Sequence, residues 1–309
     1  MTIDLCVWDR CNNSCLMCTN PDRPWPAWDG DFGYDFELII KRLEKHKEKI
    51  NKAESIYLTG GEPTLHPQFL DILKYLAKNF PKQRLKLLTN GRRFVYQDFA
   101  KRVLSVTNNF EIDMSLCGPT SEVHDSVTQA GGSFEQAIGG LKNLLKNKKR
   151  GQVIGVRTVL NKITYQQIPQ TLFLLRKEAS SLDRVIVVFM ELEAQAIKNI
   201  DLVKINYAQV RPYINQTVPI LKDFKEIRFY HFPLCAADKE IWPYVWRTLP
   251  ADEVDFVAVC GECNYKNLCL GVHRGYLENV SKKDFLPIRG KIEIELSGDF
   301  YQPIKKVFI

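Results

Sequence analysis

The sequence lacks any long uncharged hydrophobic run. No stretch of about 18 or more apolar residues occurs in the 309-residue chain, and a membrane-spanning helix needs at least that length. The N-terminus, MTIDLCVWDR, has neither a basic segment before an apolar core nor a small-residue cleavage site, so nothing indicates secretion. Internal repeats and low-complexity tracts are also missing. We therefore expect a cytoplasmic globular protein.

A strong excess of one charge is missing as well. The chain has 43 Lys and Arg against 36 Asp and Glu, a formal net charge of +7. The basic residues are spread through amphipathic segments such as KRLEKHKEKINK, residues 41–52, where a solvated helix face accounts for them. Charge therefore does not indicate a nucleic-acid partner.

Cysteine, by contrast, is plentiful. The chain has nine cysteines and no export signal, and in a reducing compartment clustered thiols usually bind metal. Three of them lie within CNNSCLMC near the N-terminus, and a second group of four lies in the last quarter of the chain. Cys6 falls within an apolar run, where packing accounts for it.

Apolar β-branched runs alternate with amphipathic helical patterns over the first two thirds of the chain. The patterns predict strands at 3–8, 55–60, 84–90, 110–116, 152–160 and 184–192, and helices at 34–50, 67–80, 96–106, 133–148 and 165–179. Six such units predict an α/β fold, a partial (β/α)6 TIM-like barrel. A helix near 207–221, a strand at 226–230 and a loop-rich tail follow, so we predict a barrel over 1–205 and a small cysteine-rich extension over 206–309.

The notable short motifs follow successive predicted strands. CNNSCLMC follows the first strand, TGGEP the second, TNG the third and SLCGP the fourth. The carboxyl ends of parallel strands meet at one edge of a sheet or barrel, where ligands bind. The order of the motifs therefore predicts one shared site.

The N-terminal triple is Cys11, Cys15 and Cys18. Three thiolates can hold a [4Fe–4S] cluster and leave one iron open for another ligand, much as catalytic zinc keeps an open position. A zinc knuckle is the alternative. It needs a fourth ligand nearby, and the closest histidine, His46, falls on a predicted helix.

C-x3-C-x2-C after the first strand of an α/β barrel resembles the signature of radical S-adenosylmethionine (radical SAM) enzymes. In that family the open iron binds the amine and carboxylate of SAM, and an electron from the cluster cleaves a C–S bond to give a 5′-deoxyadenosyl radical. The family usually has an aromatic residue before the third cysteine. Here Met17 takes that position and can cover an adenine face.

TGGEP resembles the second motif of the family, although taken alone it is also an ordinary turn. Gly60 and Gly61 allow the backbone to approach a ligand closely. The resemblance implies that Glu62 or the adjacent backbone accepts from the methionyl ammonium, with Pro63 closing the motif. Asn90, in a predicted turn with Gly91, is expected to line the same mouth.

SLCGPTSEVHD, residues 115–125, resembles the fourth-strand segment of the family. The resemblance places Ser115 beside the ribose and Arg157 at the SAM carboxylate, although Arg157 could equally form a structural ion pair. Relatives often have aspartate where this chain has Cys117. Cys117 is either a small buried hydrophobe or a catalytic group that faces the substrate or relays a hydrogen atom.

The C-terminal group consists of Cys235, Cys260, Cys263 and Cys269. A metal would supply folding energy to a tail too small for its own core, and spacing alone also allows a tetrahedral zinc. C-x2-C-x5-C followed by Gly271 resembles the SPASM and twitch extensions of radical SAM barrels, which implies one auxiliary [4Fe–4S] cluster. If one cysteine is not a ligand, His273 could contribute nitrogen.

The overall pattern is similar to radical SAM enzymes that crosslink, epimerise or oxidise ribosomally made peptides. Many of these begin with a peptide-recognition domain, which is not expected here, so a separate recognition protein would be needed. The partners implied are a reductant such as flavodoxin or ferredoxin, and a peptide or small-molecule substrate.

One alternative is oxidation or methylation of a small molecule or pterin-like cofactor. Another is a non-catalytic iron–sulfur or zinc scaffold or electron carrier, which would not need TGGEP or Arg157. The loop at 19–34, with Trp25 and Trp28, is expected to cover the site.

Overall fold

The computed structural model describes residues 2–20 and 33–308. Trp25 and Trp28, the two tryptophans of the loop expected to cover the site, lie outside the described residues. Each helix within the described ranges is too short or too polar to cross a lipid bilayer.

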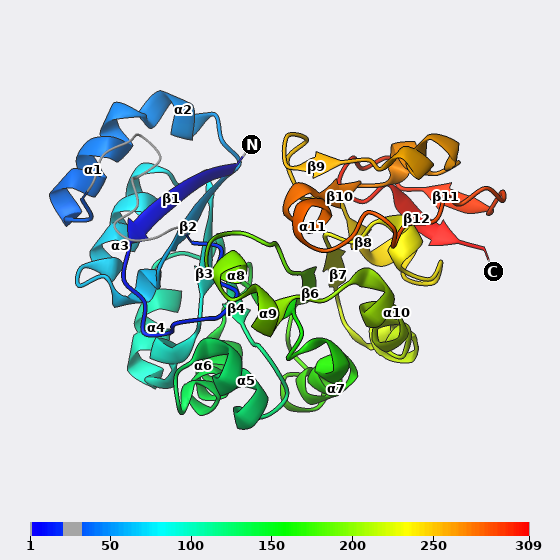
Figure 1. Cartoon of the computed structure of the whole chain (residues 1–309). Helices are drawn as coiled ribbons and strands as arrows, with labels where there is room; N and C mark the ends of the chain where they lie inside the picture. The colour runs from blue at the N-terminus through cyan, green and yellow to red at the C-terminus, as the bar shows by residue number, and fades with distance from the viewer. Residues whose placement is uncertain (1, 21–32, 309) are drawn as a thin grey trace.

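An eight-stranded sheet forms the centre of the molecule (Figure 1). Its strands follow one another in chain order and every neighbouring pair is parallel. They are β1 (Thr2–Trp8), β2 (Ser55–Gly60), β3 (Arg84–Thr89), β4 (Phe110–Ser115), β5 (Val153–Leu160), β6 (Arg184–Phe189), β7 (Ile227–Tyr230) and β8 (Val245–Trp246). This confirms the α/β partial-barrel fold, with two strands more than the six expected.

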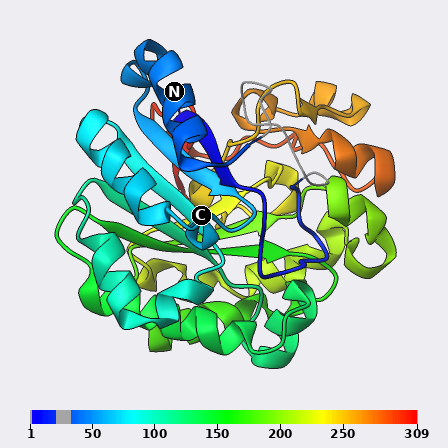
Figure 2. The ribbon, with the colours of Figure 1, turned by 90° about the vertical axis from the view of Figure 1, so that its left-hand side faces the viewer.

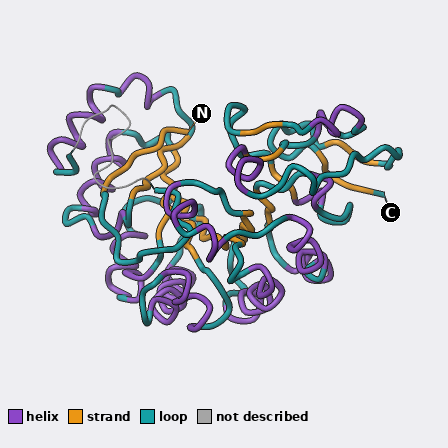
Figure 3. The backbone as a smooth tube through the Cα atoms, in the orientation of Figure 1, coloured by secondary structure: helices purple, strands orange, loops and turns teal. Residues whose placement is uncertain are grey.

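Helices connect successive strands, and most of them lie on the outer side of the curved sheet (Figures 2 and 3). The short helix at 194–198 lies instead beside the cysteine loop, where the Gln195 N–H donates to the carbonyl of Cys18 at 3.1 Å. The helices are α1 (Phe36–Lys45), α2 (Lys47–Asn51), α3 (Phe69–Asn79), α4 (Gln97–Leu104), α5 (Ser121–Thr128), α6 (Ser133–Asn147), α7 (Ile168–Glu178), α8 (Ala194–Lys198), α9 (Ile200–Val203) and α10 (Tyr207–Asn215). The helices expected between residues 34 and 179 are observed with their ends at most three residues away, except that the segment 34–50 is divided at His46; the segment 165–179 starts with a 3-10 turn.

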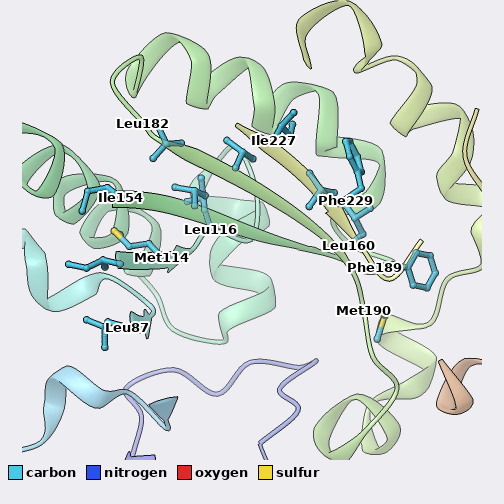
Figure 4. Packing of buried hydrophobic residues seen from close by; sticks show 14 of the residues in the cluster. Leu87, Met114, Leu116, Ile154, Leu160, Leu182, Phe189, Met190, Ile227 and Phe229 are labelled. Atoms are coloured by element: carbon cyan, nitrogen blue, oxygen red, sulfur yellow. The ribbon is translucent and has the colours of Figure 1, made fainter. Parts of the chain in front are cut away.

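Apolar side chains fill the space between the sheet and these helices. In α3 the buried residues are Phe69, Ile72, Leu73 and Leu76, which is the spacing that places one stripe on one helix face. The outward face of the sheet supplies the other half of this core, as Leu87, Met114 and Ile154 show in Figure 4.

The inward face is polar near the amino ends of the strands. Glu111 of β4 accepts from Arg84 of β3 at 3.3 Å and also pairs with Arg184 of β6. Arg184 in turn bonds Glu226 at 2.8 Å, and Glu226 pairs with Arg228 of β7. This chain of ion pairs satisfies charges that would otherwise be costly to bury, and it closes the end of the barrel opposite the cysteine loop.

The C-terminal part contains β9 (Val254–Asp255) paired with β10 (Val272–His273), α11 (Arg274–Asn279), and β11 (Ile294–Leu296) paired with β12 (Ile304–Val307). In Figure 1 it lies beside β7 and β8, at the other end of the sheet from β1. Because β7 and β8 come from the segment assigned to the extension, they join it directly to the sheet. The division at residue 205 stays a prediction.

Candidate active site

A cavity of about 510 Å³ opens at the carboxyl ends of the strands, within the size range of small-molecule sites. The predicted site residues that line it are Cys11, Cys15, Met17, Cys18, Gly60, Gly61, Asn90, Ser115, Cys117 and Arg157. Residues that are separated widely along the chain therefore meet in one place, whereas Glu62 and Pro63 are not part of this lining.

The cysteine loop is fixed by the end of α5. The backbone N–H groups of Ser14 and Leu16 donate to the carbonyls of Thr128 and Val127 at 2.9 and 3.0 Å. These carbonyls belong to the last turn of the helix, which has no helical donors of its own for them. The loop thus supplies hydrogen-bond donors to the last turn of α5, and these bonds fix the position of the loop.

Two side chains that follow β3 also contact the loop. Arg92 donates to the carbonyl of Asn12 and to Asn13 Oδ1, the latter at 2.7 Å. Asn90 Nδ2 lies 2.7 Å from Asn12 Oδ1 and 3.8 Å from Cys11 Sγ, and the Asn13 N–H donates to the same sulfur at 3.4 Å. Cys11 therefore has two N–H donors directed at its sulfur.

The three thiols are close enough to affect one another. Burial raises the pKa of Cys15, and Cys117, Cys18 and Cys11 each raise it further. Bringing such groups together as thiolates requires a cation, and soft thiolate donors suit iron–sulfur clusters and zinc. The donor set and the shared cavity thus fit the cluster expected from the sequence.

The glycines of TGGEP allow the chain after β2 to pack against the chain after β1. Gly60 has φ of +133°, and a Cβ at Gly61 would lie 2.3 Å from the carbonyl oxygen of Arg10. Gly61 and Glu62 donate their N–H groups to the carbonyls of Trp8 and Arg10 at 2.7 and 2.8 Å. Only residues without a side chain allow this close contact.

Glu62 faces the protein interior and is 1% exposed. Oε1 accepts from the N–H and hydroxyl of Thr64 at 3.1 and 2.5 Å and from the hydroxyl of Thr89 at 2.7 Å, and Oε2 accepts from the Asn90 N–H at 2.7 Å. Burial raises the pKa of this carboxyl, while these hydrogen bonds lower it. The side chain joins the β2 and β3 loops, whereas Gly60 and Gly61 line the cavity.

Ser115, the last residue of β4, pairs in register with Arg157 in the middle of β5, and both line the cavity. The Arg157 guanidinium lies 5.7 Å from the ring centroid of Tyr230. Burial raises the pKa of Tyr57 far above its usual range, and Arg157 acts in the opposite direction. Within the described part of the chain no carboxylate forms a salt bridge with Arg157, although its charge lowers the pKa of Glu191 and of Asp113.

Cys117 lines the same cavity but is only 3% exposed. Burial raises the pKa of its thiol to about 12, and its backbone N–H donates to His124 Nδ1 at 3.1 Å. The thiol is therefore protonated at neutral pH. A protonated, buried thiol fits a packing role and also hydrogen-atom transfer.

The four C-terminal cysteines line one small apolar pocket, shared with Phe256, Tyr265 and Phe285 among others. Burial raises the pKa of Cys235 to about 12, and the backbone N–H groups of Leu234 and Gly271 donate to Cys269 Sγ at 3.4 and 3.5 Å. The space between them is about 20 Å³, and no three His, Cys, Asp or Glu side chains in the described ranges converge on a single-ion position. Four soft donors in one pocket suit zinc or an iron–sulfur cluster.

His273 lies outside this thiol pocket. Its Nε2 is 3.2 Å from Glu193 Oε1, and its Nδ1 is buried without a hydrogen-bond partner among the described residues. The ring therefore faces the loop after β6 and does not face the cysteines.

Asp4, Tyr57 and Glu191 are ionisable residues among the further lining residues that sequence patterns did not identify. Asp4 and Tyr57 alternate with the core residues Leu5 and Leu58 along β1 and β2, so the two-residue strand period could have revealed them. Glu191 was assigned to a strand through 192, whereas β6 ends at Phe189.

Comparison with protein families gives an independent result. A family model described as the radical SAM superfamily matches residues 5–175, more than half of the chain. The chain belongs to the radical SAM superfamily. Its members are enzymes, so this radical SAM protein is an enzyme, and the scaffold or electron-carrier alternative is set aside. Membership implies a [4Fe–4S] cluster and S-adenosylmethionine as cofactors.

Curated relatives of this radical SAM enzyme are matched over part of their length. The tungsten-containing aldehyde ferredoxin oxidoreductase cofactor-modifying protein of Pyrococcus furiosus is 29% identical over 179 residues, 53% of this chain and 45% of that protein. The mycofactocin maturase MftC of Mycobacterium tuberculosis is 29% identical over 136 residues, 43% of this chain and 32% of that protein. The chain spans less than half the length of these two relatives.

Solved structures share the fold. The structure of anSMEcpe with bound AdoMet aligns with a TM-score of 0.60 at 14% identity, over 93% of this chain and 92% of that chain. Streptococcus suis SuiB bound to the precursor peptide SuiA aligns with a TM-score of 0.57 at 14% identity, over 79% and 50%. At these identities the similarity establishes the fold.

Proposed function

We propose that this radical SAM enzyme modifies a ribosomally made peptide by crosslinking, epimerisation or oxidation. The observation that carries the proposal is the single cavity in which the thiols of the first loop, the glycine edge after β2, Ser115 and Arg157 meet. The similarity to a maturase supports the peptide class of substrate, and SuiB, which shares the fold, was crystallised with a precursor peptide.

In this proposal Cys11, Cys15 and Cys18 hold the cluster, and one iron is left for SAM. When bound, the cluster supplies the electron that cleaves SAM reductively to a 5′-deoxyadenosyl radical. Arg157 binds the SAM carboxylate through its guanidinium, whose planar donor pattern matches that group. Ser115 bonds the ribose, and Met17 covers the adenine. The buried walls position one substrate hydrogen and exclude water from the reacting carbon.

The C-terminal pocket completes the proposal. Cys235, Cys260, Cys263 and Cys269 would hold an auxiliary iron–sulfur cluster in a SPASM- or twitch-like extension. The partners proposed are a reductant such as flavodoxin or ferredoxin, the substrate, and a separate peptide-recognition protein. The name of the Pyrococcus furiosus relative, a cofactor-modifying protein, favours a second candidate, in which the substrate is a small molecule or pterin-like cofactor.

Anaerobic reconstitution tests the cofactor part of the proposal. We expect about eight irons per chain and release of 5′-deoxyadenosine on reduction with SAM. Cys15→Ala should abolish release, whereas Cys6→Ala, which removes a buried thiol outside the cavity, should retain it. The double variant Cys260→Ala/Cys263→Ala should lower the iron to about four and leave uncoupled SAM cleavage.

The possible results separate the parts of the proposal. About one zinc with about four irons would overturn the auxiliary cluster only. Zinc binding with no SAM cleavage would overturn the proposed chemistry. Incubation with the products of short neighbouring reading frames, and with pterin-like cofactors, distinguishes the two substrate classes by mass spectrometry.

A further inference from the structure

Glu191 lies in the loop directly after β6 and lines the cavity. Its side chain is 24% exposed, so it is largely enclosed while part of it reaches the open space. In the order of the sheet, β6 is separated from β1 and the cysteine loop by β2 to β5. The carboxylate therefore belongs to a different wall of the cavity from the cysteines.

The nearest ionisable neighbour of Glu191 is His231, whose Nδ1 lies 3.4 Å from Oε1. The same nitrogen lies 3.1 Å from the carbonyl oxygen of Phe189. A carbonyl only accepts, so Nδ1 carries the proton. Burial, assisted by Arg157, lowers the pKa of His231 to about 3. The imidazole is therefore uncharged: it can orient the carboxylate but cannot neutralise it.

The position of His231 is held firmly. Its φ is +66°, a left-handed backbone conformation that a residue other than glycine keeps only where the surrounding structure fixes it. Its carbonyl oxygen accepts from the Tyr207 hydroxyl at 2.8 Å, and its side chain is 5% exposed. A buried ring fixed in this way gives Glu191 a defined direction into the cavity.

Two further carboxylates, Glu193 and Glu253, continue from Glu191 toward the C-terminal part. Burial raises the pKa of Glu191; His273 and Arg157 lower it, and Glu193 and Glu253 raise it further. No lysine or arginine in residues 2–20 and 33–308 forms an ion pair with any of these three carboxylates. This acidic strip (Glu191, Glu193 and Glu253) contrasts with the net charge of +7.

His273 provides a second observation at the strip. Its ring is 5% exposed, directs Nε2 at Glu193, and leaves Nδ1 without a partner among the described residues. Arg157 also lowers the pKa of Glu191, but Arg157 is assigned to the SAM carboxylate above. Of the three carboxylates, Glu191 is the largely enclosed one, whereas Glu193 is 49% exposed and Glu253 is exposed. An enclosed negative charge is costly until a cation binds, and no lysine or arginine of residues 2–20 and 33–308 forms an ion pair with Glu191.

We propose that Glu191 binds a positively charged group of the substrate, such as a lysine or arginine side chain or an amino terminus, and that Glu193 and Glu253 guide this group into the cavity. The inference rests on the proposed function in that it concerns the substrate of the same site. On this proposal, a substrate binds the enzyme tightly only when it has a basic group next to the reacting position.

The test uses SAM-loaded, cluster-reconstituted enzyme without reductant, so that binding is measured separately from chemistry. The probe is an equimolar mixture of short synthetic peptides that differ only in a central Lys, Gln or Glu, and retention on the enzyme is measured by ultrafiltration and mass spectrometry. We expect the Lys peptide to be retained about fivefold or more over the Gln peptide, the scale of one charge pair.

Glu191→Gln should remove this preference, and Glu193→Gln and Glu253→Gln should reduce it. Glu135→Gln, which removes the same charge from an exposed position on α6, is the control and should retain it. SAM affinity should be unchanged in all four variants.

Two results would overturn the inference. If the wild-type enzyme retains Lys and Gln peptides equally, the strip does not select a cation. If Glu191→Gln weakens SAM binding as strongly as peptide binding, the residue belongs to the cofactor site. Failure of the proposed function would instead show as no release of 5′-deoxyadenosine after reduction, which leaves the peptide preference measurable.

Discussion

At the scale of single residues, the hydrogen bonds to Cys11 decide how easily a cluster on that cysteine accepts an electron. Asn90 Nδ2 is directed at Cys11 Sγ at 3.8 Å. N–H donors to a ligating sulfur stabilise the reduced, more negative form of a cluster. Asn90→Ala should therefore lower the reduction potential, on the order of 40 mV if the bond is worth about 1 kcal/mol.

Potentiometric titration followed by electron paramagnetic resonance measures this potential. Asn79→Ala is the control, because Asn79 donates within α3 to the carbonyl of Tyr75 at 2.9 Å and is not part of the cavity lining. An unchanged potential in Asn90→Ala would show that this contact does not tune the cluster.

Asp113 predicts a pH dependence of stability. It is 6% exposed, and Oδ1 has no partner among the described residues. Burial raises its pKa to about 6, Glu111 adds to this, and Arg184, Arg157 and Arg228 oppose it. The folded state therefore holds this proton to higher pH than the unfolded chain, whose Asp has a pKa of about 3.9. Stability contributed by this group falls as pH rises from about 4 to about 6.

Asp113→Asn removes that dependence. Measured relative to wild type, the free energy of unfolding of the variant should rise by about 1 kcal/mol between about pH 5 and about pH 7.5. Thermal unfolding midpoints at the two pH values measure the change. Asp71→Asn on the exposed face of α3 is the control, and an equal response of the two variants would contradict the assignment.

At the scale of elements, the contact between the β1 and β2 loops sets the shape of the cavity. Gly61→Ala would place a Cβ 2.3 Å from the Arg10 carbonyl oxygen, which forces the two loops apart. We expect a loss of about 2 kcal/mol or more of stability and at least tenfold weaker SAM binding, measured by calorimetry. Gly131→Ala is the matched control, because its added Cβ meets nothing within 4 Å. Equal behaviour of the two variants would contradict the proposed role of the contact.

At the scale of the whole molecule, aromatic packing joins the barrel to the C-terminal part. The Phe189 ring stacks on Tyr207 with centroids 3.9 Å apart, and Tyr207 contacts Tyr276 and Phe285 at 4.7 and 5.7 Å. A chain ending at residue 205 would keep Phe189 but would lose Tyr207, Tyr276 and Phe285. It would also lose β7 and β8 and would expose the edge of β6. Exposed strand edges pair with other chains.

We therefore expect the 1–205 fragment to aggregate, whereas the 309-residue chain should elute as a defined species with one cooperative unfolding transition. Size-exclusion chromatography and circular dichroism measure both. A monomeric, folded fragment would establish the predicted boundary as a true domain boundary.

Local patterns in the sequence determined much of this protein. The apolar runs and helical periodicities determined six strands and their crossover helices, because each element must bury one of its own faces. The spacing of Cys11, Cys15 and Cys18 and the adjacent TGGEP determined the family, because these residues lie close together along the chain or directly after a strand.

Tertiary structure decided the rest. Glu62 and Glu191 are both carboxylates after a strand, yet Glu62 is enclosed by threonine and backbone donors whereas Glu191 faces the cavity. The barrel also takes up β7 and β8 from the cysteine-rich part. These outcomes depend on contacts between residues far apart in the chain, and the free energy of such contacts is fixed only when the sheet curves and its neighbours are in place.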